Sequence, residues 1–176
     1  MENFAVIDFE TMGMSPSEKV RAVSVSLAVV KDGQVVERFH SLMNSGVPMP
    51  EDAEMLTGIT SGMLANSPVS SVVMQQVVSL TKGCRLAAHN ADFHQAFWLF
   101  ELAASGIHQD DAPFICTLKL ARQTYPGLDI YALNNLAAAL GLPSEEGPES
   151  MPTNADLATN LLLHIQHEFE PRSRNS

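Results

Sequence analysis

The chain has 176 residues, of which 45% are hydrophobic, and it carries a formal net charge of −10. A chain of this length and composition can bury the core of one domain without disulfides or structural metals. Its ten basic residues stand against 20 acidic ones. This balance excludes a broad duplex-coating surface, because such surfaces neutralise phosphates with lysine and arginine. Any polynucleotide would be held locally, by a few groups such as Lys82, Arg85, Lys119 and Arg122.

The cysteines and the start of the chain bear on the cellular compartment. Cys84 and Cys116 lie far apart in apolar surroundings, a pattern typical of reduced thiols in an intracellular protein. No apolar run approaches the roughly 18 residues of a membrane-spanning helix, and the N-terminus lacks a signal-peptide pattern. We therefore expect a cytoplasmic protein with no membrane partner.

The apolar segment from Phe4 to Gly13 predicts a strand with two acids near its end. Successive strand residues point to opposite faces, so Asp8 and Glu10 project from the same face, roughly 6–7 Å apart. Two carboxylates at that distance repel each other, and proteins commonly keep such a pair where a divalent cation lies between them. The alternative is an edge strand whose polar face meets water. This segment leaves both interpretations open.

A hairpin, two helices and a short buried strand are predicted next. Residues 23–30 have the hydrophobic alternation of a strand and are followed by a turn at 31–34, so 35–42 is predicted as the returning strand of a hairpin. Helical spacing covers 51–56 and 68–80. The short apolar run at 84–88 is typical of a buried strand.

The second half of the chain predicts helices joined by turns. The clearest helix is 92–104, where Asp92 and Gln95 have the spacing of a capping box. The remaining predictions are helices at 115–123 and 134–140, a proline-rich mobile loop at 142–152, and a last helix from 154 to about 167 that Thr153 caps. Together the elements predict an α/β fold, a mixed sheet flanked by helices. We expect one domain at 1–168 and a flexible tail at 169–176.

Five segments, in this order, resemble the motifs of a known family. They are DFETMG at 8–13, MLTGITSGML at 55–64 with Pro68 after it, AHNADFH at 88–94, ICTLKLAR at 115–122 and NADLAT at 154–159. The family is the DnaQ-like 3′-to-5′ exonucleases, the DEDD group of the ribonuclease H-like fold. One such motif would be weak support, whereas five in register indicate the fold strongly.

The resemblance implies a nuclease that uses divalent ions, Mg²⁺ or Mn²⁺, at the 3′ end of DNA or RNA. Asp8 and Glu10 match the first two acids of the family, and Asp156 matches the aspartate of the third motif. These three are the implied catalytic and metal-binding residues. The residues implied to contact the substrate are Thr11, Met12, Gly13, His89, Asn90 and His94.

The chain departs from the family pattern in two motifs. His94 stands where the family has its second aspartate, and nearby Asp92 points about 200° away along the helix. Histidine is a poor ligand for Mg²⁺ and an acceptable one for Mn²⁺ or Zn²⁺, but a hydrogen-bonded histidine at the pocket wall is the simpler interpretation. Five residues before Asp156, where the family has a histidine base, the chain has Met151. Matching the last motif without a gap would instead put Ala155 at the aspartate position.

These departures predict one well-held ion, a doubtful second ion and weakened hydrolysis. We expect an exonuclease-family protein that acts on or binds 3′ ends, with single strands favoured over duplexes. The alternative is an inactive pseudo-nuclease that binds a nucleic-acid end or a protein partner. A homodimer is compatible with both hypotheses. The ionisable residues that the proline-rich loop could offer as a base are Glu145, Glu146 and Glu149.

Overall fold

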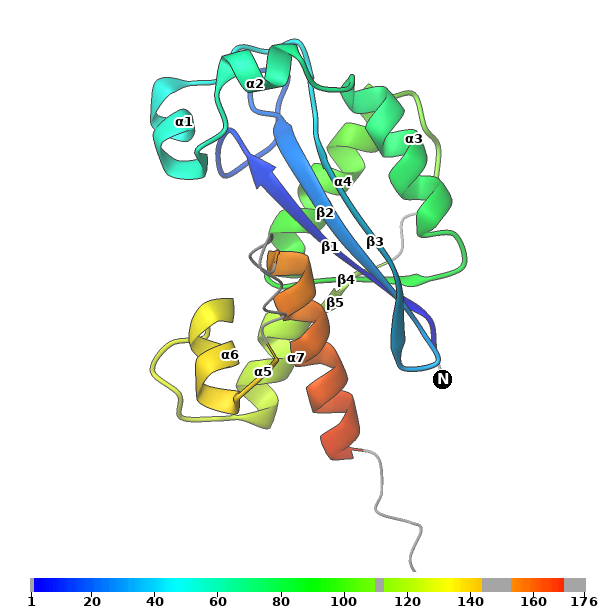
Figure 1. Ribbon diagram of the computed structural model, residues 1–176, viewed down its shortest axis with the longest axis vertical. Helices are drawn as coiled ribbons and strands as arrows, with labels where there is room; N and C mark the ends of the chain where they lie inside the picture. The colour runs from blue at the N-terminus through cyan, green and yellow to red at the C-terminus, as the bar shows by residue number, and fades with distance from the viewer. Residues whose placement is uncertain (1, 110–112, 144–152, 170–176) are drawn as a thin grey trace, which may run out of the picture.

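The computed structural model describes residues 2–109, 113–143 and 153–169, and its centre is one five-stranded sheet (Figure 1). The strand order is β3-β2-β1-β4-β5. β1 pairs antiparallel with β2, and β2 with β3, whereas β4 is parallel to both β1 and β5. This arrangement confirms the predicted mixed sheet. The strands are β1 Phe4–Thr11, β2 Ala22–Lys31, β3 Gln34–Leu42, β4 Arg85–Ala88 and β5 Ile115–Cys116.

Helices cover both faces of the sheet (Figure 1). Odd-numbered residues of β1, such as Ala5 and Ile7, pack with α3 and α4. Even-numbered ones, Phe4 and Val6, pack with α7 on the other face, and α5 and α6 join α7 there through a smaller core cluster. The helices are α1 Glu51–Thr57, α2 Ser61–Ala65, α3 Ser70–Leu80, α4 Ala91–Ala104, α5 Thr117–Thr124, α6 Leu133–Leu140 and α7 Asn154–Phe169.

The predicted turn between β2 and β3 is confirmed. Lys31 pairs with Gln34 across it, and the two central residues, Asp32 and Gly33, have φ values of 50° and 76°. Aspartate and glycine enter this left-handed region more readily than most residues. Two such residues give the tight connection that suits twisted antiparallel strands.

Three helical features of the structure differ from what the sequence predicts. The segment 115–123 begins as strand β5, because its first two residues pair with β4, and becomes helical only afterwards. The short helix α2, which the side chain of Thr60 caps, was not predicted. The capping box at Asp92 is wrong: the N-cap of α4 is Asn90, whose side chain makes no capping bond, and Asp92 pairs with Lys119 at 3.0 Å.

The cap of the last helix is confirmed. The Asp156 N–H donates to Thr153 Oγ1 at 3.2 Å, and the Thr153 N–H donates to Asp156 Oδ2 at 3.0 Å. Residues 144–152 of the predicted loop, and the predicted tail from 170 onward, lie outside the described residues. In the part of the chain that is described, no helix is both long and apolar enough to cross a bilayer.

Candidate active site

The two acids of β1 lie where α7 stops covering the sheet. Val6 is buried against α7, and Asp8 and Glu10 follow it on the same face. A cavity of about 310 Å³ opens there. It is lined by Asp8, Phe9, Glu10, Thr11, Met14, Leu56, Thr57, Asn90, Phe93, His94 and Asn154.

Both acids are held partly out of water. Burial and, after it, the nearby charge of Glu10 raise the pKa of Asp8 to about 7, against a hydrogen bond from Asn154 that lowers it. Burial also raises the pKa of Glu10. A carboxyl whose pKa rises on folding keeps a proton that the unfolded chain has lost, so stability falls as the pH rises from 3.8 to about 7. A cation between the carboxylates would offset this cost, because it stabilises their charged forms.

His94 is a buried neighbour of Asp8. Its Nδ1 accepts a hydrogen bond from the Phe9 N–H at 3.1 Å, and its Nε2 lies 3.4 Å from Asp8 Oδ1. Burial, followed by the nearby His89 ring, lowers the pKa of His94 to about 4, although a hydrogen bond with the His89 backbone raises it. The ring is therefore uncharged at neutral pH, and because Nδ1 is an acceptor, the proton is on Nε2. In this state the ring has no free lone pair for a metal ion.

The start of α7 presents Asn154, and not Asp156, to the acids. Asn154 lines the cavity, and its side chain hydrogen-bonds to Asp8. Asp156 lies two residues later, about 200° around the helix. Its carboxylate accepts from Arg38 Nε at 3.0 Å and caps its own helix. The structure thus does not bring Asp156 together with Asp8 and Glu10, and the residue beside them is one that neither predicted register of the third motif named.

The two predicted substrate residues at the end of β4 take different places. Asn90 lines the cavity in a left-handed conformation, with φ of 65°, which asparagine tolerates better than most residues. His89 does not line the cavity. Its Nδ1 lies 2.9 Å from Thr117 Oγ1 and its Nε2 lies 2.9 Å from the Tyr131 carbonyl oxygen. His89 therefore joins the start of α4 to α5 and to the segment before α6.

The three residues that follow Glu10 also take different places relative to the cavity. Thr11 lines the cavity, and its hydroxyl donates to the Gly13 carbonyl at 2.7 Å. Met12 is only 6% exposed and packs in a core cluster, and Gly13 does not line the cavity. The register of β1 with β2 shifts between Glu10 and Thr11, and β1 ends at Thr11, so the strand alternation does not continue to Met12 and Gly13.

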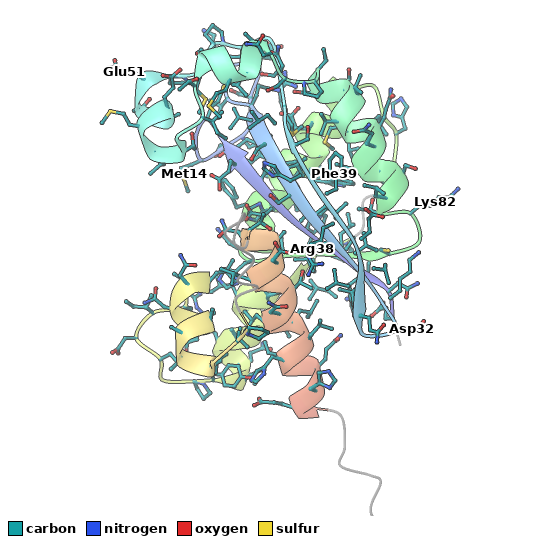
Figure 2. All side chains as sticks on the ribbon, in the orientation of Figure 1. Met14, Asp32, Arg38, Phe39, Glu51 and Lys82 are labelled. Atoms are coloured by element: carbon teal, nitrogen blue, oxygen red, sulfur yellow. The ribbon has the colours of Figure 1, made fainter. Side chains whose placement is uncertain are left out.

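An apolar rim that was not predicted from the sequence borders the acids. It consists of Met14, Leu56 and Phe93, all of which line the cavity. Met14 and Leu56 expose 80% and 86% of their surface, and Figure 2 shows Met14 at the end of β1, below α1. Large apolar side chains so exposed at the mouth of a cavity are typical of a surface that binds something. The available signal was an apolar residue directly after DFETMG and another before TGIT.

The donor atoms suit one hard divalent cation. Within the described ranges, no three His, Cys, Asp or Glu side chains form a metal-binding group. Asp8 and Glu10 contribute two carboxylates, and the side chain of Asn154 can add an amide oxygen beside Asp8. Mg²⁺ and Mn²⁺ prefer such oxygen ligands, and Mg²⁺ usually keeps several waters as well. The neutral His94 and Asn154 do not add the charge that a second ion would need.

A mixed sheet of this order, with paired acids on its central strand beside the start of a helix, defines the class of ribonuclease H-like nucleases. Residues 5–146 match the model of the RNase T-type exonuclease family. The chain belongs to this exonuclease family.

Relatives and solved structures agree with this assignment. The 3′-5′ exonuclease DinG of Bacillus subtilis (strain 168) is 31% identical over 164 residues, which are 93% of this chain and 18% of DinG. The chain thus spans less than a fifth of this relative. Exonuclease X in complex with 5′ overhanging duplex DNA has a TM-score of 0.73 at 24% identity, covering 94% of this chain and 92% of that chain. E. coli Exonuclease I in complex with a dT13 oligonucleotide has a TM-score of 0.74 at 15% identity, covering 96% and 41%. These likenesses confirm the predicted fold.

Proposed function

We propose that this chain is a 3′-to-5′ exonuclease domain that holds one divalent cation at Asp8 and Glu10 and acts slowly on single-stranded 3′ ends. The observation that carries the proposal is the acid pair on β1, which lies on one face at the floor of a cavity with an apolar rim. A divalent cation bound there would polarise a phosphate and acidify a bound water.

The residues of the cavity divide the remaining tasks. Asp8 lies between the Asn154 side chain and His94 Nε2, which fix its orientation. Asn90 lines the same cavity and offers an amide to sugar and phosphate oxygens. The Thr11 hydroxyl donates to the Gly13 carbonyl, so its oxygen is left only as an acceptor. The apolar rim fits the face of a terminal base, because stacking on apolar and aromatic side chains is the usual way of holding unpaired bases.

A single strand suits this surface better than a duplex. Ten basic residues in a chain with a net charge of −10 cannot neutralise a long stretch of phosphates. The exposed rim instead needs a base that is free to leave its stack. Exonuclease I, a structural neighbour, has been solved with a dT13 oligonucleotide, which supports this choice.

Hydrolysis should be slow because parts of the family's site are changed. His94 occupies the second-motif position, and Asn154 lies beside Asp8 where a third-motif acid is expected. His94 Nδ1 already accepts the Phe9 N–H, so this ring cannot take a proton from water. Loss of general-base assistance typically costs a factor of about 10²–10⁴ in rate.

A labelled single-stranded oligonucleotide tests the proposal. With Mn²⁺ and a 5′ label, we expect slow shortening from the 3′ end by the parent and none by Glu10→Gln. The matched control is Asp129→Asn, because Asp129 is exposed and does not line the cavity. This control should keep the parent's rate. Equal rates for the parent and Glu10→Gln would contradict the proposal.

Binding without hydrolysis is the second candidate function. The neutral side chains of His94 and Asn154 beside Asp8 favour it. In that case the oligonucleotide would bind the parent in the presence of Mn²⁺, raising the fluorescence anisotropy of a labelled strand, and would stay intact after long incubation.

A further inference from the structure

β1 extends beyond its parallel partner just where the two acids lie. The β1–β4 ladder pairs Phe4 with Arg85 and ends with Val6 and Ala87. Phe9 therefore lies past the end of β4, on a stretch of β1 that has β2 on one side only. A buried backbone N–H without a partner costs about as much as a lost hydrogen bond, so the Phe9 N–H needs an acceptor.

His94 supplies that acceptor from α4. The Phe9 N–H donates to His94 Nδ1 at 3.1 Å, in a contact that is buried and joins residues 85 positions apart. The ring is 6% exposed and packs edge-on against Phe93, with 5.0 Å between ring centroids. Its orientation is thus fixed by packing as well as by the hydrogen bond.

The same contact determines which ring nitrogen carries the proton. An imidazole that accepts at Nδ1 must carry its proton at Nε2, because an imidazolium ring has no lone pair with which to accept. Nε2 lies 3.4 Å from Asp8 Oδ1. The ring therefore joins the backbone of Phe9 to the carboxylate of the residue just before it.

We propose that His94 is a positioning residue, which fills the open edge of β1 at Phe9 and orients Asp8 through its Nε2–H without binding the cation itself. This inference rests on the proposed function, in which Asp8 binds the divalent cation. It differs from a histidine ligand, which would need a free lone pair on Nε2 and hence a proton on Nδ1.

Two amide substitutions separate the ring's contact with the Phe9 N–H from its contact with Asp8. His94→Asn keeps an acceptor near the position of Nδ1 for the Phe9 N–H but is too short to reach Asp8. His94→Gln reaches Asp8 with its NH₂ group but removes the acceptor near Nδ1. In calorimetric titrations with Mn²⁺ alone, we expect His94→Asn to bind about tenfold or more weakly than the parent, as is typical when a residue that orients a metal ligand is lost. His94→Gln should bind nearly as tightly as the parent.

Stability should change in the opposite order. We expect His94→Gln to unfold at a lower temperature than His94→Asn, because only the glutamine leaves the Phe9 N–H without its acceptor. If His94 served only the fold, the less stable of the two variants would also be the one that binds Mn²⁺ more weakly. That result, or parent-like Mn²⁺ binding by His94→Asn, would overturn the proposal.

Nitrogen NMR of the ring separates this proposal from the proposed function. In the metal-free parent we expect the proton on Nε2 and an unprotonated Nδ1, with no change when Mg²⁺ or Zn²⁺ is added. A proton on Nδ1, or coordination of the added ion by Nε2, would overturn the role of His94. A parent that shows the expected ring but binds no Mn²⁺ would overturn the proposed function, and with it the use of His94 in orienting a metal ligand.

Discussion

Replacing Arg21 with methionine is expected to lower the free energy of unfolding by about 3–5 kcal/mol. Glu101, near the end of α4, has 0% of its surface exposed. Its carboxylate accepts from Arg21 Nε at 2.9 Å, from Arg21 Nη2 at 2.7 Å and from the Ala22 N–H at 3.0 Å. Without the guanidinium, a buried carboxylate would keep one backbone partner and no cation. Urea unfolding at neutral pH measures the loss.

The control for this prediction is Arg85→Met. Arg85 pairs with Glu2 at 3.4 Å, and the two side chains are 51% and 54% exposed. Exposed pairs of this kind contribute about 1 kcal/mol or less. Similar losses of unfolding free energy in Arg21→Met and Arg85→Met would contradict the prediction. They would show that burial does not increase the contribution of the Arg21–Glu101 pair. The pair also bears on the site, since the Arg21 carbonyl accepts the Met12 N–H at 3.0 Å, just after the acids.

The double variant His94→Asp with Asn154→Asp is expected to increase Mn²⁺-dependent hydrolysis of a single strand on the order of 10²-fold or more. His94 on α4 and Asn154 on α7 are the side chains that contact Asp8. The two substitutions turn both of them into carboxylates. With four carboxylates around the cavity, a second cation can be held against the repulsion between the acids. The rate is measured on a 5′-labelled strand.

Asp156→Asn, made in the same double variant, provides the matched control. Asparagine can replace the aspartate as a cap, and Asp156 faces Arg38 rather than the cavity. We therefore expect this third substitution to leave the gained activity unchanged. If it removes the activity, the third motif acts through Asp156, as the resemblance to the family implies, and the placement of Asn154 is wrong.

The fold could be predicted from the sequence because its signals are local. The strand β2, the Asp32-Gly33 turn and the Thr153 cap each have a signal in neighbouring residues, and all three are confirmed. The short strand β5 was missed, because two residues carry no period and acquire strand structure only by pairing with β4.

The site could be predicted only in part, because it depends on contacts between distant segments. Asp8 and Glu10 followed from the alternation of one strand, and both line the cavity. Asp156 was predicted because it matches the aspartate of the family's third motif, whereas the structure uses it as a cap. Neither the ladder that ends at Val6 nor the contact of His94 with Phe9 leaves a local pattern in the sequence.

Calorimetric titration with Mn²⁺ at pH 8 tests whether Asp8 and Glu10 hold one cation. The metal-free parent is titrated beside Asp8→Asn. We expect one ion bound per chain in the parent and none in Asp8→Asn. In EDTA we expect Asp8→Asn to be more stable than the parent, because the substitution removes a buried carboxylate whose pKa is raised. Two bound ions or no bound ion in the parent, or unchanged binding in Asp8→Asn, would contradict the proposal that Asp8 and Glu10 hold one cation.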